Sequence, residues 1–319
     1  MGIEQSTSKQ EVAEASWQIA GVSWANIALF VVLAFALSWC IWIVLRAVGI
    51  PLLIYGAIGM FGPTLASVIV RLVRHEGFAD AGLRLVGRGV KRGGWMYLAA
   101  YVSIPLLLAA GIGLALLTEV QHWAFASNLH QLGVAAVDAV HKQGRSLLAG
   151  MTGDQLALVS IGTQTILAFT LAILFNMIFT FGEEFGWRGY LLPRLAPLGG
   201  VRAALITGII WGLWHAPVIV LAGYNYPGHP WLGIGMMVVF TTSLSLIFAW
   251  LRFRSGSIWP STLAHAALNG QAGFALILLS HADPLIGAPI GIIGVLPMLA
   301  FGGWLAATGR LRPTRGAEI

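Results

Sequence analysis

Long apolar segments separated by short polar ones run along almost the whole chain. About 20 predominantly apolar residues are needed for a helix to cross the hydrocarbon core of a bilayer. Eight segments approach or meet that length, at residues 24–47, 52–73, 95–117, 156–182, 203–222, 232–250, 258–280 and 286–307. The pattern predicts an all-α fold, a polytopic membrane helix bundle with about eight transmembrane helices.

The polar segments divide the chain into a single domain and two tails. We expect one membrane-embedded domain at residues 21–309, with a polar tail at 1–20 and a basic tail at 310–319. The longest polar stretch between the apolar segments, residues 118–155, carries apolar positions among polar ones. This spacing predicts an amphipathic helix lying on the outer surface of the membrane.

Composition and charge agree with this topology. The chain is 58% hydrophobic and 9% charged, whereas soluble domains carry roughly a quarter of charged residues. With a cytoplasmic N-terminus, 15 of the 18 Lys and Arg residues fall on the cytoplasmic side, leaving Arg46, Lys142 and Arg145 outside. This bias follows the positive-inside rule. It predicts a multi-pass protein of the bacterial inner membrane with both termini cytoplasmic, contacting lipids and no nucleic acid.

Four ionisable residues break the apolar pattern. Glu183 and Glu184 end one segment, while His215 and His265 lie inside two others. Ionisable groups inside a membrane are unfavourable by several kcal/mol, and therefore mark functional sites. All four lie near the cytoplasmic half or the middle of the bilayer, so they can converge in one cavity open to the cytoplasm. The one cysteine, Cys40, lies in an apolar run, and we expect it to be a buried structural thiol.

Helical spacing assigns different partners to the two glutamates. Glu184 and Arg188 are four residues apart, so they share a helix face and are expected to form an ion pair. Glu183 points roughly 100° away, where the sequence offers no local cation. A carboxylate held there is suited to act as a general base.

The two histidines each share a helix face with another candidate residue. Trp211 lies four residues before His215, and Asn269 lies four residues after His265. An imidazole and a carboxamide that project together are good donors toward a developing oxyanion. Hydrogen bonding between membrane helices is the structural alternative for each of these polar groups.

Three short motifs in this region resemble those of the CPBP family, the CAAX proteases and bacteriocin-processing proteins, also called the Abi family. Residues 183–188 read EEFGWR and resemble the EExxxR motif of the family. Residues 211–215 resemble its second motif, an aromatic residue followed four places later by histidine, with tryptophan in place of the commoner phenylalanine. Residues 265–269 match its third motif, HxxxN. The resemblance covers about residues 156–280.

The resemblance implies an all-helical intramembrane endopeptidase of the type II CAAX prenyl protease kind. By analogy, Glu183 and His215 activate a water molecule, and His265 and Asn269 stabilise the tetrahedral oxyanion. The residues that would shape and polarise the site are Glu184, Arg188 and Trp211. The implied partner is a membrane-associated or lipidated protein or peptide substrate.

Three alternatives remain open from the sequence. Glu183, His215 and His265 form a legitimate zinc ligand set, although a metal-independent reaction with no cofactor is favoured because the second histidine is paired with an amide. A transporter could also use intramembrane acids and histidines, but no internal repeat is present. A non-catalytic immunity or binding protein with the same fold is the third alternative.

Overall fold

The computed structural model of the chain describes residues 18–19, 21–87, 93–142 and 150–313. Most of the expected tail at 1–20 and the end of the tail at 310–319 lie outside the described residues. Arg145, which the topology places outside the membrane, is also outside them.

The secondary structure of the described chain is almost entirely helical. Its two short strands, β1 (Gln18–Ile19) and β2 (Val22–Ser23), pair antiparallel. The all-α prediction is therefore confirmed. The α-helices are α2 (Trp24–Ala47), α3 (Leu52–Gly59), α4 (Gly62–Val73), α5 (Trp95–Leu117), α6 (Phe125–Lys142), α7 (Gly153–Phe169), α8 (Leu171–Gly186), α9 (Leu192–Leu195), α10 (Gly200–Trp214), α11 (Ala216–Ala222), α12 (Pro230–Ser255), α13 (Trp259–Gln271), α14 (Phe274–Leu278) and α15 (Ile292–Ala307). A π-helical turn, η3 (Trp187–Leu191), joins α8 to α9, and two 3₁₀ turns are η1 (Ala79–Ala81) and η4 (Ala196–Leu198).

The predicted apolar segments all become helical, but they are not equally long. Within the described residues, five helices are long and apolar enough to cross a bilayer: Trp24–Ala47, Leu52–Val73, Trp95–Leu117, Gly200–Ala222 and Pro230–Ser255. The pair formed by α7 and the run Leu171–Leu198 is bent by 53° and would make a sixth span. The chain is an integral membrane protein by this criterion.

The last two predicted spans differ from the expectation. Residues 258–280 form α13, which has only 13 residues, and the short α14. The final span shortens to the 16 residues of α15. Helix α13 is surrounded by neighbouring helices, and its buried residues include the polar side chains of Ser261 and Thr262.

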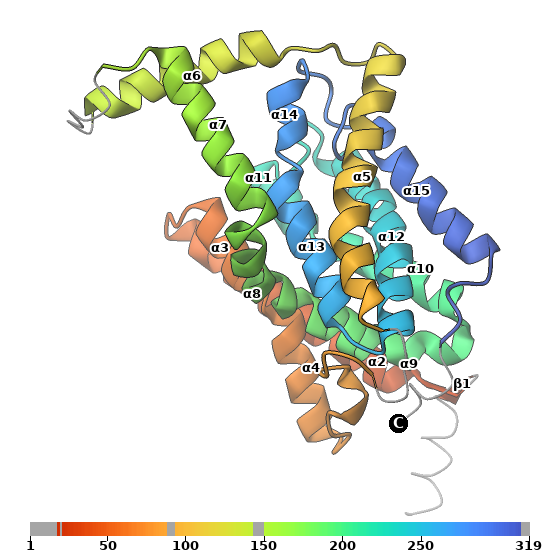
Figure 1. Ribbon diagram of the computed structural model, residues 1–319. Coiled ribbons are helices and arrows are strands. Elements are labelled where there is room, and N and C mark those ends of the chain that lie inside the picture. Colours follow the sequence, from red (N-terminus) through yellow and green to blue (C-terminus); the bar gives the residue numbers. More distant parts are fainter. Residues whose placement is uncertain (1–17, 20, 88–92, 143–149, 314–319) are drawn as a thin grey trace, which may run out of the picture.

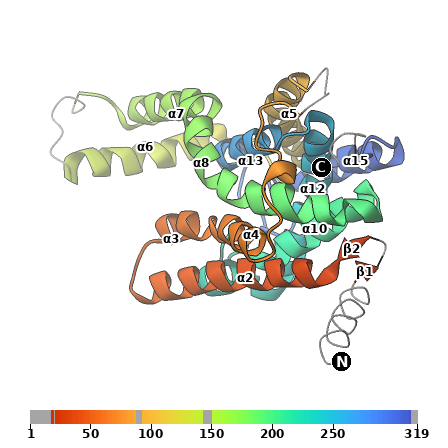
Figure 2. The same ribbon diagram turned by 90° about the horizontal axis from the view of Figure 1, so that it is seen from below.

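Helix α13 occupies the middle of the bundle, where it packs against α8, α5 and α12 (Figures 1 and 2). Helix α10 packs against α12, and α2 packs against α4. A hydrogen bond from the Thr180 hydroxyl to the Thr262 carbonyl oxygen, 3.1 Å long, ties α8 to α13. Helices α8 and α13, which carry the first and third motifs, are therefore direct neighbours, and α10, which carries the second, contacts η3 at the end of the first.

The polar stretch before α7 contains the predicted additional helix, α6, which lies against α7 and extends away from the bundle (Figure 1). Its position on the membrane surface stays a prediction. Cys40 on α2 is exposed, so the expectation of a buried thiol is wrong. Its side chain lies on the outward face of α2, where neighbouring positions such as Ile43 and Val44 are also exposed.

Candidate active site

The glutamate pair lies between two glycines on α8 that set the direction of both side chains. Gly182 and Gly186 are four residues apart and face α4, where a Cβ at Gly182 would lie 2.8 Å from the Met60 carbonyl oxygen. Such close backbone contact is typical of small residues at membrane helix interfaces. Because successive residues turn by 100°, Glu183 and Glu184 point away from α4, toward α10 and α13.

Glu184 is the centre of an ion-pair cluster. Its Oε1 atom accepts a hydrogen bond from Arg188 Nη1 at 2.8 Å and lies 3.0 Å from His265 Nδ1. Glu184 and Arg188 are fully buried, and His265 is nearly so. The ion pair predicted from the four-residue spacing is present. An ionised carboxylate only accepts, so His265 Nδ1 carries a proton and its Nε2 atom is left for other partners.

Trp211 connects the other glutamate to the other histidine. Its indole Nε1 donates to Glu183 Oε2 at 2.6 Å, and its backbone carbonyl oxygen lies 2.9 Å from His215 Nδ1. Since a carbonyl oxygen only accepts, His215 donates from Nδ1, and the neutral ring keeps a lone pair on Nε2.

Arg188 is enclosed by aromatic rings. Its Cζ atom lies 4.5 Å from the centre of the Trp211 ring and 4.9 Å from that of Phe248. Its Nε and Nη2 atoms, and Glu184 Oε2, are buried without a hydrogen-bond partner in the described part of the chain. Planar guanidinium groups stack well on aromatic faces. The arrangement fixes the position of Arg188 and leaves donors unused beside the carboxylates.

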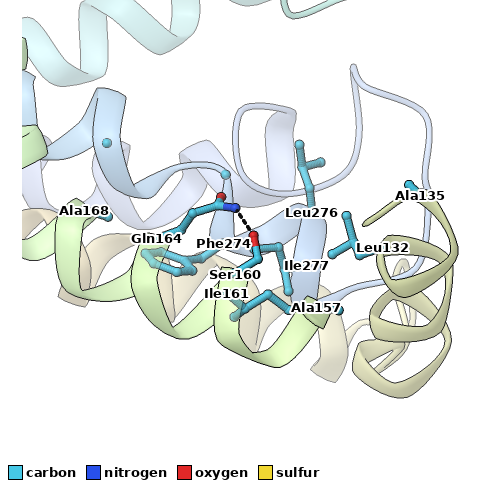
Figure 3. Close-up of a pocket in the computed structure, with 12 residues that line it drawn as sticks. Leu132, Ala135, Ala157, Ser160, Ile161, Gln164, Ala168, Phe274, Leu276 and Ile277 are labelled. Atoms are coloured by element: carbon cyan, nitrogen blue, oxygen red, sulfur yellow. Dashed lines mark hydrogen bonds between the residues drawn. The ribbon is translucent and has the colours of Figure 1, made fainter. Parts of the chain in front are cut away.

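Asn269 is placed differently from the other candidates. It lies on α13 one turn after His265 but is exposed, whereas His265 is buried. A pocket of roughly 520 Å³ lies beside that end of α13, between α6, α7 and α14, and Gly270 lines it (Figure 3). A hydrogen bond of 2.9 Å joins Gln164 to Ser160 in its wall. None of the predicted site residues lines this pocket, so it is separate from the acidic cluster.

The possible zinc set does not assemble as a metal site. Among the described residues, no three His, Cys, Asp or Glu side chains are grouped so that they could hold a metal ion, and this includes Glu183, His215 and His265. Hydrogen bonds to Trp211 and Glu184 occupy Glu183 Oε2 and the Nδ1 atoms of both histidines, and leave both Nε2 atoms free of hydrogen bonds to the described residues.

A second polar cluster at the α8–α9 junction was not predicted from the sequence. Arg71 Nη1 lies 2.6 Å from Asp80 Oδ1, and Arg194 forms ion pairs with both Asp80 and Glu76. Burial alone would raise the pKa of Asp80, but hydrogen bonds and charges from Arg71 and Arg194 outweigh it and lower that pKa below its usual value. In the sequence these residues look like ordinary cytoplasmic charges, since only the fold brings them together.

Together, the fold and the cluster define an all-helical membrane protein with paired buried carboxylates and two histidines from separate helices. The family model described as "Type II CAAX prenyl endopeptidase Rce1-like" matches residues 163–271, the segment that carries all three motifs. This match confirms the predicted resemblance to CAAX proteases for that segment.

One relative gives the same indication. Over 93 residues the chain is 30% identical to CAAX prenyl protease 2 of Methanococcus maripaludis, covering 27% of this chain and 34% of the relative. The chain therefore spans about a third of the length of the curated relative that it matches. The family match covers the region of the three motifs, and the N-terminal helices fall outside it.

Proposed function

We propose that the chain is an intramembrane endopeptidase that hydrolyses peptide bonds of membrane-associated or lipidated protein substrates. The observation that carries the proposal is the buried cluster of Glu183, Glu184, Arg188 and His265, joined to His215 through Trp211. Burying ionisable groups inside a membrane costs free energy, so a cluster of them from three helices indicates a functional site. The protease family matches the same segment of the chain.

In the proposed reaction, Glu183 and His215 activate the attacking water. His215 presents the lone pair of Nε2 because Nδ1 donates to the Trp211 carbonyl oxygen. The Trp211 indole holds one oxygen of Glu183 at 2.6 Å and fixes the carboxylate beside it. The water oxygen attacks the scissile carbonyl carbon, its proton passes to these acceptors, and the proton then moves to the departing amine.

The oxyanion that forms on the substrate carbonyl would be bound by His265 and Asn269. With Nδ1 donating to Glu184, a protonated His265 has Nε2–H as a second donor. The exposure of Asn269 suits a residue that meets the substrate directly, since it is one turn from His265 on α13. Preorganised donors of this kind stabilise the tetrahedral intermediate.

The orientation of the proposed protease follows from the charge distribution. Most Lys and Arg residues lie on one side of the eight apolar segments, so we propose that both termini and the active site face the cytoplasm. The name of the archaeal relative refers to prenylated substrates. Prenylated C-terminal peptides therefore belong among the substrates to be tested.

The test is cleavage of a quenched peptide library, including prenylated C-terminal sequences, by the purified protein in lipid nanodiscs. Glu183→Gln and His215→Ala are compared with Glu119→Gln and His122→Ala, which make the same chemical changes at exposed positions. We expect both site variants to lose at least about 100-fold in kcat and both controls to cleave like the wild type.

Other results would redirect the proposal. Site variants that cleave as fast as the wild type would refute the assignment of these residues. Loss of cleavage with a zinc-selective chelator and its return with zinc would make the enzyme metal-dependent. Substrate flux into intact liposomes without any cleavage would identify a transporter. Protection against a bacteriocin that survives Glu183→Ala would identify a non-catalytic immunity protein.

A further inference from the structure

The turn that follows the glutamate pair has an unusual backbone. Residues Trp187–Leu191 form a π-helix, and the Leu192 N–H donates to the Trp187 carbonyl oxygen five residues back. Pro193 comes next and has no N–H. It removes the α-helical donor to the Gly189 carbonyl oxygen and the π-helical donor to the Arg188 carbonyl oxygen. Buried carbonyl groups left without donors are unfavourable, and such π-turns often occur at functional sites.

Two buried arginines from distant helices supply donors to these two carbonyls. Arg252 on α12 donates from Nε to the Arg188 carbonyl oxygen at 3.2 Å. Arg71 on α4 donates from Nη2 to the Gly189 carbonyl oxygen at 2.8 Å. Arg71 is 1% and Arg252 is 5% exposed. Each arginine therefore holds the backbone of the turn that carries the Arg188 side chain.

The short loop at η1 holds both arginines in place. The Asp80 carboxylate accepts from Arg71 at 2.6 Å, and the Asp80 carbonyl oxygen accepts from Arg252 Nη2 at 2.8 Å. The loop also lies directly on the π-turn, because a Cβ at Gly189 would be 3.2 Å from the Ala81 carbonyl oxygen. The η1 loop therefore contacts both arginines that donate to the Arg188 and Gly189 carbonyl oxygens.

We propose that Arg71 and Arg252 are positioning residues that hold the π-turn so that Arg188 stays against Glu184. This inference rests on the proposed protease function. Neither arginine contacts the glutamates in any hydrogen bond or ion pair of the described chain; both act through the backbone at Arg188. Small displacements of a catalytic group lower rates strongly, about 100-fold for roughly 1 Å.

The first experiment compares arginine substitutions on the same helices. Arg252→Gln and Arg71→Gln shorten the side chain and remove the guanidinium donors, whereas Arg254→Gln in α12 and Arg74→Gln directly after α4 make the same change at exposed positions. We expect the two buried variants to lose about 10- to 100-fold in kcat with little change in KM, and the two controls to match the wild type. Equal rates in buried and control variants would overturn the proposal.

A double-mutant comparison separates positioning from general destabilisation. If Arg252 acts through Arg188, then Arg252→Gln has little further effect on kcat when Arg188→Gln is already present. An unchanged fold-loss in that background would show that Arg252 acts elsewhere. Should Arg252→Gln fail to fold, Arg252→Lys takes its place in the comparison, since it keeps the charge but cannot reach both carbonyls with its single nitrogen.

A third measurement decides the proposal without any cleavage. Amide hydrogen exchange of the peptide covering residues 187–195 reports opening of the turn. We expect exchange at least about 10-fold faster in Arg252→Gln than in Arg254→Gln, with the rest of the bundle unchanged. Unchanged exchange in this peptide would refute the proposal. A wild type that cleaves no peptide would count against the protease function alone, because the exchange result stands independently.

Discussion

Replacing Trp211 by phenylalanine tests whether the indole ring organises the acidic cluster or an aromatic ring is sufficient. Phenylalanine is the commoner residue at this place in the family that the motifs resemble. In this chain the tryptophan adds an N–H that donates to Glu183 Oε2 at 2.6 Å. The substitution keeps an aromatic ring between α10 and its neighbours and removes this donor.

The expected effect can be worked from the contacts of Trp211. Both Trp211 and Glu183 are 2% exposed, and loss of a hydrogen bond to a buried charged group lowers the free energy of unfolding by about 1.5–3 kcal/mol. The Arg188 guanidinium lies 4.5 Å from the ring centre, and a phenyl ring weakens that cation–π contact by less than about 1 kcal/mol. The total is about 3 kcal/mol, or roughly 150-fold in the unfolding equilibrium.

Equilibrium unfolding in mixed detergent micelles measures this loss. Trp231→Phe is the matched control, because Trp231 is 75% exposed and its change should stay within about 0.5 kcal/mol. A double-mutant cycle with Glu183→Met should give a coupling of at least about 1 kcal/mol. If Trp211→Phe is as stable as the control, or if the cycle is additive, the hydrogen bond does not contribute as argued.

Three further predictions concern the surrounding structure. Asp80 has a lowered pKa in the folded protein, so Asp80→Asn should destabilise the protein at neutral pH. The difference in stability from wild type should vanish as the pH falls below the ordinary pKa of 3.8 and through the lowered one. Unfolding curves at several pH values check this. Gly182→Ala should lower stability by about 1–3 kcal/mol, since its Cβ would meet the Met60 carbonyl oxygen in the turn before α4. Gly113→Ala, whose Cβ would meet nothing, should be neutral or stabilising in the same assay. Pro193→Ala restores a backbone N–H, so amide exchange in the π-turn should become slower. We also expect a lower kcat. Faster exchange would contradict the account of that turn.

Much of the fold was predictable because bilayer thickness and helix rise set how many consecutive apolar residues a spanning helix needs. Two predicted segments, 24–47 and 95–117, coincide with helices of the structure. Segments were less well predicted where polar residues lie inside the bundle. Helix α13 is short and partly polar, and other helices surround it. Hydropathy alone does not distinguish such a protein-facing helix from a broken span.

The candidate site was predictable to the extent that it depends on residues of one helix. The Glu184–Arg188 ion pair follows from a four-residue spacing and is present. The link between Glu183 and Trp211 joins residues 28 positions apart, and the exposure of Asn269 differs from that of His265 on the same helix. These features depend on how helices are rotated against each other, which the spacing within one helix does not specify.

The amino-acid sequence alone predicts a membrane helix bundle, an orientation with most Lys and Arg residues on the cytoplasmic side, and three motifs that carry the candidate chemistry. Those properties follow from hydrophobicity and from the 3.6-residue period of a helix. The structure was needed to show that Glu183 accepts from the Trp211 indole, that Glu184 also meets His265, and that Arg71 and Arg252 donate to a π-turn at the site. Helix rotations are set by close contacts between residues that are distant in sequence, as where Gly182 lies against the Met60 carbonyl oxygen just before α4.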